Sequence, residues 1–300
     1  MTADHSDTLP IHAEIGVIGG TGFYQMDGLT EVSRVHLDTP FGTPSSAITI
    51  GTLQDRRVAF ISRHDEGHRI LPLELPALAN IYAFKSISVQ QVMTVPAVGS
   101  LREEMAPRHT VIPDQLIDRT RGRRSTFFGE GAIAHVGCAD PFDETLSEAL
   151  AAGADASDIT THQGGTLVVM DAPTFSTRAE SRLYRSWDAS IIGMTALPEA
   201  KFAREAELCY ASLCFVTDYD VWYETEADVR SELILSNLHA NAEHAKTTVG
   251  QRAIASLDRT LPGCECRSAL AGALITPKEL VPVATRRQLN LLTERYWGPA

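Results

Sequence analysis

The chain has 300 residues, of which 44% are hydrophobic and 21% charged, a composition typical of a globular protein with a sizeable core. Its 38 acidic and 26 basic side chains give a formal net charge of -12, which argues against a nucleic-acid or membrane-surface binder, because either needs a basic face. No apolar run approaches the roughly 20 residues of a membrane span. The polar residues 1–12 lack the hydrophobic core of a signal peptide, so we expect a cytoplasmic protein.

Strand and helix patterns alternate along most of the chain. Residues 1–13 are expected to be disordered, and the stretch from residue 250 to the last helix to be rich in loops. The spacing of apolar residues predicts strand 14–19, hairpin 45–62, helix 75–86, strands 91–95 and 110–117, long loop 118–142, helix 141–153, strand 165–171, helix 176–187, strand 190–195, helix 197–210, strand 211–217, and helices 225–247 and 285–296. This alternation predicts an α/β fold in which a central sheet is flanked by helices, as one domain over residues 14–300.

A glycine-rich turn follows the first predicted strand. Residues 15–23 read Ile-Gly-Val-Ile-Gly-Gly-Thr-Gly-Phe. Backbone N–H groups at such a turn point outward, with no Cβ to block an approaching oxyanion, and Thr21 adds a hydroxyl. The third glycine of a dinucleotide-binding motif is missing, so a small anion such as phosphate is the better functional interpretation. A plain tight turn after a core strand is the alternative.

Polar clusters recur where predicted strands end. Ligands of α/β sheets bind beyond the carboxyl ends of strands, so the recurrence predicts one shared site. Arg63 offers a guanidinium group suited to phosphate or carboxylate, although a solvated loop is the alternative for Arg63 and His64. The clusters are Thr21, Arg63 with His64, Ser100, Ser176, Met194 with Thr195, and Asp218 with Asp220.

Asp218 and Asp220 follow an apolar strand at positions i and i+2. If the segment stays extended, both carboxyl groups point to one face, where they can accept from an amino group and hold a proton for a ring nitrogen. One of them then needs a raised pKa. An acidic turn is the alternative. His64 and His68 have a spacing that could hold a metal, but no third ligand is evident, so we expect no metal site.

The five cysteines do not suggest a secreted disulfide framework, because their number is odd. Cys209 and Cys214 lie in apolar surroundings and are expected to be buried thiols. Cys264 and Cys266 form a C-x-C pair that could bind metal or form a strained disulfide. We expect instead a pair of reduced surface thiols, because no other cysteine or histidine lies nearby in the sequence to complete a metal site.

The ordered motifs resemble those of the purine nucleoside phosphorylase family, in its methylthioadenosine phosphorylase branch. The resemblance extends from about residue 14 to 247 and implies a mixed central β-sheet. The motifs are Gly-Gly-Thr-Gly at 19–22, Asp-Thr-Pro-Phe-Gly at 38–42, Arg63-His64 with His68, Gly-Ser-Leu-Arg-Glu at 99–103, Asp-Gln-x-Ile-Asp-Arg-Thr at 114–120, Phe-Ser-x-Arg-Ala-Glu-Ser at 175–181, Met-Thr-x-x-Pro-Glu at 194–199 and Thr-Asp-Tyr-Asp-x-Trp at 217–222.

The resemblance implies phosphorolysis of a 5'-modified adenine nucleoside, such as 5'-methylthioadenosine, to adenine and a ribose 1-phosphate derivative. Phosphate would be the co-substrate, with no other cofactor. Asp218 would be the catalytic residue facing N7 of the purine, and Asp220 would face the 6-amino group. The phosphate-binding positions would be Thr21, Arg63, His64, Pro96, Ala97 and Thr195.

The remaining substrate contacts implied by the resemblance lie around the sugar. Met194 would pack against the ribose. His135 matches a residue that reaches across a subunit interface toward the neighbour's 5' group, so the resemblance implies a homotrimer. The other substrate-binding positions would be Phe175, Ser176, Ser231 and Ile234.

The chain departs from the family pattern on the phosphate side. The family's threonine pair is Val95-Pro96 here, and proline supplies neither an N–H nor a hydroxyl. Asp65 and Glu66 would repel phosphate if they face it. These differences leave two alternatives open: a nucleosidase or other glycosyl-transferring enzyme of a specialised nucleoside pathway, and a catalytically weak nucleoside-binding paralogue.

Overall fold

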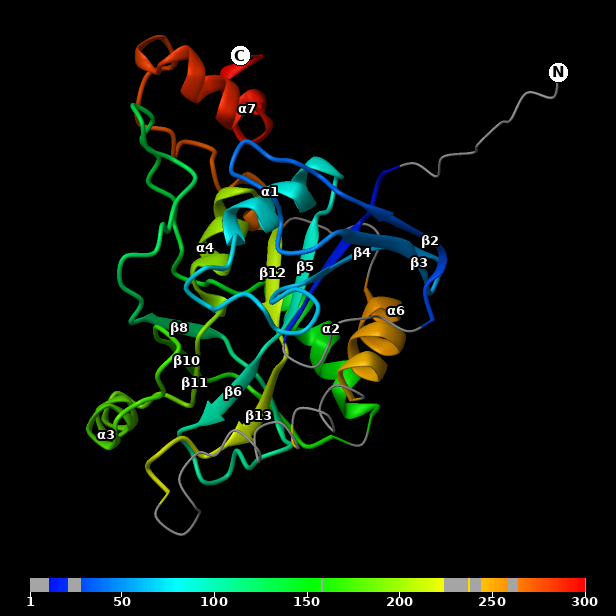
Figure 1. Cartoon of the computed structure of the whole chain (residues 1–300), viewed down its shortest axis with the longest axis vertical. Coiled ribbons are helices and arrows are strands. Elements are labelled where there is room, and N and C mark those ends of the chain that lie inside the picture. The colour runs from blue at the N-terminus through cyan, green and yellow to red at the C-terminus, as the bar shows by residue number, and fades with distance from the viewer. Residues whose placement is uncertain are drawn as a thin grey trace, which may run out of the picture.

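A computed structural model describes residues 11–20, 28–157, 159–223, 237, 244–257 and 264–299. Its strands form two sheets that meet at the centre of the molecule (Figure 1). The first sheet has the order β12 (Cys209–Ser212), β5 (Gln91–Val95), β1 (Ile15–Gly19), β4 (Arg56–Ser62), β3 (Ile48–Leu53) and β2 (Thr30–Val35). The second has the order β8 (Gln115–Asp118), β10 (Thr166–Val169), β11 (Ile191–Gly193), β6 (Ala97–Ser100), β13 (Cys214–Asp218), β7 (Thr110–Ile112) and β9 (Thr161–Gln163).

Two pairs of strands carry the chain from one sheet to the other. β5 continues into β6 across Pro96, and β12 continues into β13 across Leu213. Leu213 N–H donates to Thr94 O at 2.9 Å, and Phe215 N–H donates to Pro96 O at 2.9 Å, so pairing persists through the corner. The predicted α/β class and mixed pairing are confirmed. The single central sheet is bent into two, at a proline that cannot donate a ladder hydrogen bond.

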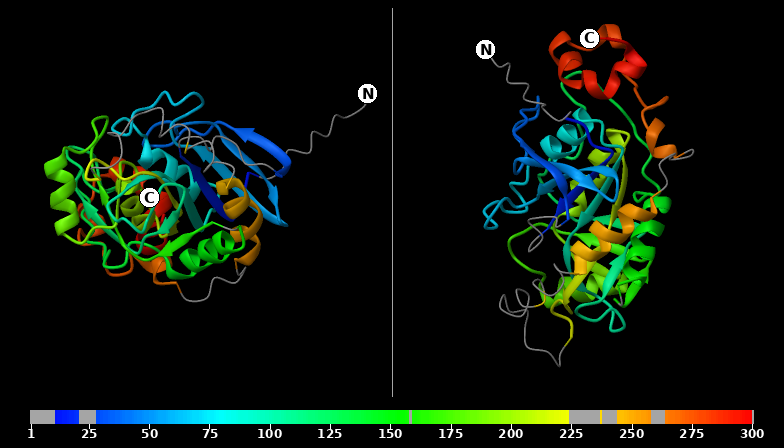
Figure 2. Two further views of the ribbon diagram at one scale, coloured as in Figure 1. Left: turned by 90° about the horizontal axis from the view of Figure 1, so that it is seen from below. Right: turned by 90° about the vertical axis from the view of Figure 1, so that its right-hand side faces the viewer.

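Helices cover the first sheet on both faces, with α1 (Ala77–Ser86) and α4 (Ala196–Glu205) on one face and α2 (Glu144–Asp155) on the other, whereas α3 (Arg178–Ser186) lies beside the second sheet (Figures 1 and 2). Alternation along β1 directs Ile18 to the core that contains Phe84 and Phe202, and directs Val17 to the core that contains Leu150. The helices are α1 (Ala77–Ser86), α2 (Glu144–Asp155), α3 (Arg178–Ser186), α4 (Ala196–Glu205), α6 (Ile254–Ser256) and α7 (Val283–Trp297), with a π-helical segment at Lys246–Ala253 and 3₁₀ turns at Glu265–Ser268 and Lys278–Leu280.

Several predicted bounds are wrong for local reasons. The helix expected over 197–210 ends at Glu205, because the chain turns at Glu207 (φ +56°) and enters β12 two residues later. The strand expected over 110–117 is two strands separated by Pro113 and Asp114. Edge strand β2 was missed because it is largely exposed and shows no buried face.

The ends of the predicted domain are tested only in part. Residues 1–10 and most of the helix expected over 225–247 lie outside the described residues. Ala13, expected to be disordered, is buried and its N–H donates to Ile87 O at 3.0 Å. Helical structure continues to Ser256, where a loop was expected.

The long segment between β8 and α2 contains no helix and no strand longer than a single bridge, as predicted. Ala134 in this segment forms an isolated bridge with Leu274. The segment also reaches α7, at one end of the molecule, where the Thr285 hydroxyl donates to Glu130 O at 2.9 Å (Figure 1). Within the described ranges, no helix is long and apolar enough to cross a membrane.

The cysteine predictions have mixed outcomes. Cys209 and Cys214 are buried thiols, as expected. The expectation of a surface C-x-C pair is wrong: Cys266 is buried and Cys264 half-buried, because tertiary packing brings Cys209 and Asp143 against them.

Candidate active site

A cavity of about 490 Å³ opens where strands of the two sheets end. It collects predicted site residues from segments far apart in sequence, which supports the interpretation of the strand-end clusters as one site. Of the clusters that lie in the described residues, Ser100 alone is absent from the lining, and its hydroxyl donates to Arg102 O at 2.7 Å. The predicted residues that line it are Arg63, His64, Pro96, Ala97, Phe175, Ser176, Met194, Thr195, Asp218 and Asp220. Thr21, Ser231 and Ile234 lie outside the described residues, so their predicted roles are untested.

Arg63 follows β4 and is fully buried. Its Nε and Nη2 donate to the two carboxylate oxygens of Glu199 at 2.6 and 3.0 Å, and Nη2 also donates to Thr94 Oγ1. Burial lowers the pKa of Arg63, but the charge and the hydrogen bonds of Glu199, with smaller contributions from Tyr210 and Cys214, together raise it above its ordinary value, so the guanidinium stays cationic. Its Nη1 has no hydrogen-bond partner within the described part of the chain, which leaves a buried cationic donor at the cavity.

Gly20 closes the same corner of the cavity. Its N–H donates to Val95 O at 3.0 Å, and Arg63 N–H donates to Gly19 O at 2.9 Å. A Cβ on Gly20 would lie 2.2 Å from Val95 O and 3.2 Å from Arg63 Nη1. The strand end therefore requires glycine for close packing of backbone on backbone.

His64 is a buried neutral base at this end of the cavity. Its Nδ1 lies 2.8 Å from Ile70 O, and because a carbonyl oxygen only accepts, Nδ1 carries the proton and Nε2 keeps its lone pair. Burial lowers the pKa of His64 to about 4, and the neighbouring charge of Arg63 acts in the same direction. The His68 ring stacks on it at 4.3 Å between centroids. Of the described residues, no third metal ligand joins the two histidines.

Asp65 and Glu66 are absent from the cavity lining. Asp65 forms an ion pair with Arg69, and Glu66 pairs with Arg34 at 3.1 Å. Left-handed backbone at Asp65 (φ +60°) turns the chain here, so these carboxylates point away from the predicted anion site. The repulsion considered from the sequence therefore does not act directly in the cavity.

Asp218 and Asp220 lie at the other end of the cavity, where β13 ends. Asp218 Oδ1 accepts from Asp220 N–H at 2.8 Å, and Oδ2 accepts from the Thr217 hydroxyl at 2.7 Å. Asp220 Oδ2 is buried without a hydrogen-bond partner among the described residues. Burial raises the pKa of the Asp220 carboxyl. The pair thus combines an oriented carboxyl group with one whose oxygen is available to a ligand.

Arg123, from the long segment before α2, supports the wall between the two ends. Its Nη1 donates to Met194 O at 2.8 Å and Leu197 O at 3.0 Å, and its Nε donates to Asp171 Oδ1 at 2.9 Å. These bonds fix the chain around Met194 and Thr195, both of which line the cavity. Thr195 precedes α4 and its hydroxyl does not cap the helix.

His135 does not line the cavity of its own chain. It is exposed on the same long segment, and its N–H donates to Ala273 O at 2.9 Å. Its predicted role toward a neighbouring subunit stays a prediction.

Sequence reasoning missed Glu199, Thr94 and Arg123 as residues that organise the site. Glu199 stood in a recognised motif, and a buried arginine requires a carboxylate partner, but the sequence did not indicate which one. Thr94 directly precedes Val95-Pro96, where the sequence departs from the family pattern, and its hydroxyl oxygen accepts a hydrogen bond from Arg63 Nη2. Nothing in the sequence distinguishes Arg123 from the other three arginines within residues 119–124.

An α/β fold whose cavity has a cationic end and an acidic end is the arrangement of a nucleoside phosphorylase. Residues 14–255 match the family model of the phosphorylase superfamily. S-methyl-5'-thioadenosine phosphorylase from Koribacter versatilis is 49% identical over 290 residues, which cover 96% of this chain and 98% of that protein. The chain belongs to the phosphorylase superfamily, in its methylthioadenosine phosphorylase branch.

Solved structures agree with this assignment. A methylthioadenosine phosphorylase from an antarctic soil metagenomic library superposes with a TM-score of 0.89 at 45% identity, covering 94% of this chain and 99% of that one. Methylthioadenosine phosphorylase from Schistosoma mansoni in complex with adenine gives a TM-score of 0.82 at 29% identity, covering 87% and 99%.

Proposed function

We propose that this protein is a pentosyltransferase that cleaves 5'-methylthioadenosine with phosphate, giving adenine and 5-methylthioribose 1-phosphate. One observation carries the proposal: a single cavity holds a buried guanidinium nitrogen of Arg63, which has no hydrogen-bond partner among the described residues, together with the neighbouring carboxyl groups of Asp218 and Asp220. The nucleoside is inferred from the similar proteins, which are methylthioadenosine phosphorylases, and one of them is solved in complex with adenine.

In the proposed reaction, a phosphate oxygen forms a bond to C1' while the C1'–N9 bond breaks and its electron pair leaves with adenine. Asp218 donates a proton toward N7 of the departing base, which makes it a better leaving group. The proton that hydrogen phosphate loses on becoming an ester restores the carboxyl group. Placement of phosphate below C1' and stabilisation of the leaving base are the two contributions of the protein.

At the phosphate end, Arg63 Nη1 and the Thr195 hydroxyl would donate to phosphate oxygens. Neutral His64 offers the Nε2 lone pair, which matches the hydroxyl of hydrogen phosphate. Pro96 has no N–H to donate, so its contribution would be limited to packing beside Ala97. No other cofactor is part of the proposal.

We further propose a homotrimer in the cytoplasm, in which His135 reaches the 5' group bound by a neighbour. In support, His135 is exposed on a long segment, next to Ile133, which is 52% exposed. Phe175 at the mouth of the cavity is 45% exposed, an apolar surface that a neighbouring subunit would cover.

The test is the release of adenine from 5'-methylthioadenosine with and without phosphate, with adenosine and inosine as comparison substrates. Release that requires phosphate, with 5'-methylthioadenosine preferred, is the expected result. Release that ignores phosphate would establish a nucleosidase, and saturable binding without release would establish a nucleoside-binding paralogue. Either result would overturn the proposal.

A further inference from the structure

Three thiols and one carboxylate meet away from the active-site cavity. Cys209 begins β12, Cys264 and Cys266 belong to the turn near the C-terminus, and Asp143 precedes α2. One ligand atom from each lies within 4.8 Å of all the others. Asp143, Cys209 and Cys266 are buried, and Cys264 is half-buried. Within the described ranges, this is the only cluster of three or more metal-ligating side chains that could surround one ion.

The separations between the ligand atoms are close to those of a tetrahedral zinc site. Cys209 Sγ lies 3.3 Å from Cys264 Sγ. Asp143 Oδ2 lies 2.8 Å from Cys264 Sγ and 3.6 Å from Cys266 Sγ. A zinc ion with Zn–S bonds of about 2.3 Å spaces two sulfur ligands about 3.8 Å apart, so only small side-chain adjustments are needed.

The backbone around the cluster orients these ligands. Asp143 Oδ1 accepts from Leu146 N–H at 2.8 Å as the N-cap of α2, which leaves Oδ2 directed at the thiols. Asp143 N–H donates to Tyr210 O at 2.8 Å, and this ties the carboxylate to the strand that carries Cys209. Cys266 N–H donates to Cys264 Sγ at 3.3 Å, a bond that a thiolate ligand strengthens.

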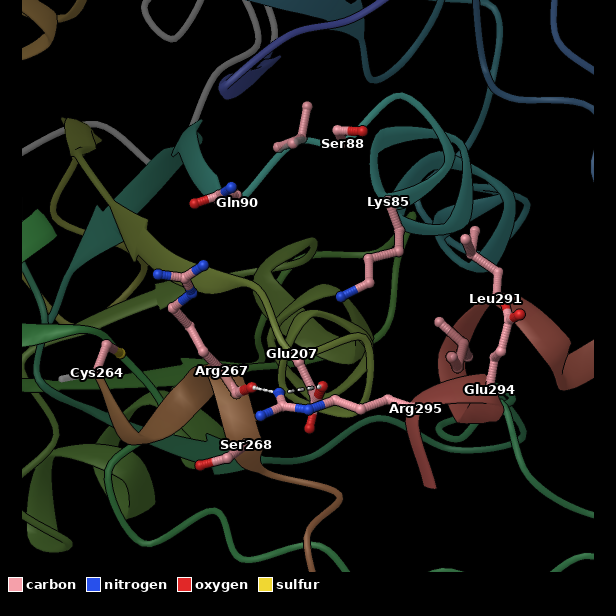
Figure 3. Close-up of a pocket in the computed structure, with 12 residues that line it drawn as sticks. Lys85, Ser88, Gln90, Glu207, Cys264, Arg267, Ser268, Leu291, Glu294 and Arg295 are labelled. Atoms are coloured by element: carbon pink, nitrogen blue, oxygen red, sulfur yellow. Dashed lines mark hydrogen bonds and ion pairs between the residues drawn. The ribbon is translucent and has the colours of Figure 1, made fainter. Parts of the chain in front are cut away.

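A second cavity gives the cluster an access path. Cys264 lines this cavity of about 780 Å³, which is distinct from the active-site cavity. Figure 3 shows Cys264 on the same turn as Arg267 and Ser268, across the opening from α1 and α7. A hydrated cation can therefore approach one ligand from solvent while the other three stay buried.

We propose that Asp143, Cys209, Cys264 and Cys266 bind one zinc ion in a closed, tetrahedral structural site. Three thiolates and a carboxylate match the preference of zinc, and no position is left for a reacting group. The ion would fasten the C-terminal turn to β12 and to the start of α2. The proposal does not depend on the phosphorylase activity.

The first test uses the untagged full chain, purified with a reductant and without chelator. We expect elemental analysis to find one zinc ion per chain. Reduced protein freed of metal and given Co²⁺ should develop a sulfur-to-cobalt charge-transfer band and the intense visible bands of tetrahedral cobalt. Absence of both zinc and the cobalt spectrum in reduced protein would overturn the proposal and leave a cluster of thiols, or a disulfide, in its place.

Substitutions of single side chains test which residues bind the metal ion. Cys264→Ser and Cys266→Ser should each weaken the cobalt charge-transfer band, by about a third for one of three thiolate ligands or completely if cobalt no longer binds, whereas Cys138→Ser, which removes an exposed thiol outside the cluster, should keep its full intensity. Asp143→Asn can still cap α2, so its cobalt spectrum should change in the visible bands while the fold is kept. A charge-transfer band of unchanged intensity in Cys264→Ser and Cys266→Ser would contradict the assignment, and the wild-type cobalt spectrum remains decisive should a variant fold poorly.

Discussion

Asp218 and Asp220 are two residues apart but have different surroundings. Both oxygens of Asp218 accept hydrogen bonds from its own loop, so its orientation is fixed before a ligand binds. Asp220 has a buried oxygen without a partner among the described residues, and burial raises the pKa of its carboxyl. In the proposed mechanism, the fixed carboxyl group of Asp218 meets N7 of the base, and the buried oxygen of Asp220 recognises the 6-amino group.

The first prediction tests that separation. Asp218→Asn should lower kcat for 5'-methylthioadenosine phosphorolysis about 100-fold or more, because an amide cannot transfer the proton to N7. Asp220→Asn is the matched control: it keeps the proton donor, so its main effect should be a higher KM for adenine nucleosides and a weaker preference for adenosine over inosine. Steady-state kinetics of both variants measure this. Equal losses of kcat in the two variants would contradict the assignment.

The burial of His64 gives a second prediction, for stability against pH. Its folded-state pKa of about 4 lies below its ordinary value of 6.5, so between these values the unfolded chain binds more protons and stability falls as pH decreases. Between pH 7 and pH 4, this residue should reduce the free energy of unfolding by about 2–3 kcal/mol.

Urea unfolding of His64→Gln measures this contribution, because the variant should lose less stability than the wild type over the same pH range. His36→Gln, at an exposed position, should keep the wild-type pH dependence. If the free energy of unfolding changes with pH in the same way in the wild type and in His64→Gln, His64 is not buried in the neutral form.

At the scale of elements, the active site depends on how closely β1 approaches β5. Gly20→Ala places a methyl group 2.2 Å from the position of Val95 O, a backbone atom that cannot rotate away. We expect a loss of about 1–3 kcal/mol of stability, typical of overpacking, together with a raised KM for phosphate. Gly137→Ala is the control, because a Cβ there meets nothing within 4 Å. If Gly20→Ala keeps the wild-type KM for phosphate, the backbone around Gly20 does not contribute to phosphate binding.

The turn after β4 shows why charges read from the sequence do not decide the electrostatics of the proposed phosphate end. Asp65 and Glu66 are adjacent in sequence to His64, which lines the cavity, yet both pair with arginines outside it. Left-handed backbone at Asp65 and Gly67 reverses the direction of the chain within three residues. The sequence shows which charges such a loop carries, but the backbone turn decides whether they face the cavity or the surface outside it.

At the scale of the whole molecule, His135 should complete the site of a neighbouring subunit. His135→Ala should lower kcat/KM for 5'-methylthioadenosine roughly tenfold, the cost of about one lost contact. Co-assembly of His135→Ala and Asp218→Asn subunits should restore part of the activity, because some sites then combine an intact Asp218 with an intact neighbouring His135. Mixtures of Asp218→Asn with Asp220→Asn, which alter the same subunit's site, should show no recovery. Failure of the first mixture to recover activity would place His135 outside the site.

Much of the fold and site followed from local patterns. Apolar periodicity predicted β1, β5 and α1 nearly to their ends, because their side chains are buried on regular faces. The motifs predicted the residues at both ends of the cavity. The bend of the sheet at Pro96 and the short helix α4 were not predictable, because long-range pairing and a left-handed turn decide them.

By itself, the sequence determined the α/β class, the family and most of the chemical groups that line the candidate active-site cavity, because strand periodicity and ordered motifs are local properties. Only the tertiary structure decided which carboxylates line the cavity. It joined Arg63 to Glu199, turned Asp65 and Glu66 outward, and brought Cys209 and Asp143 to the C-x-C pair. These contacts join residues distant in sequence or depend on the handedness of a turn, so side-chain identity and spacing do not specify them.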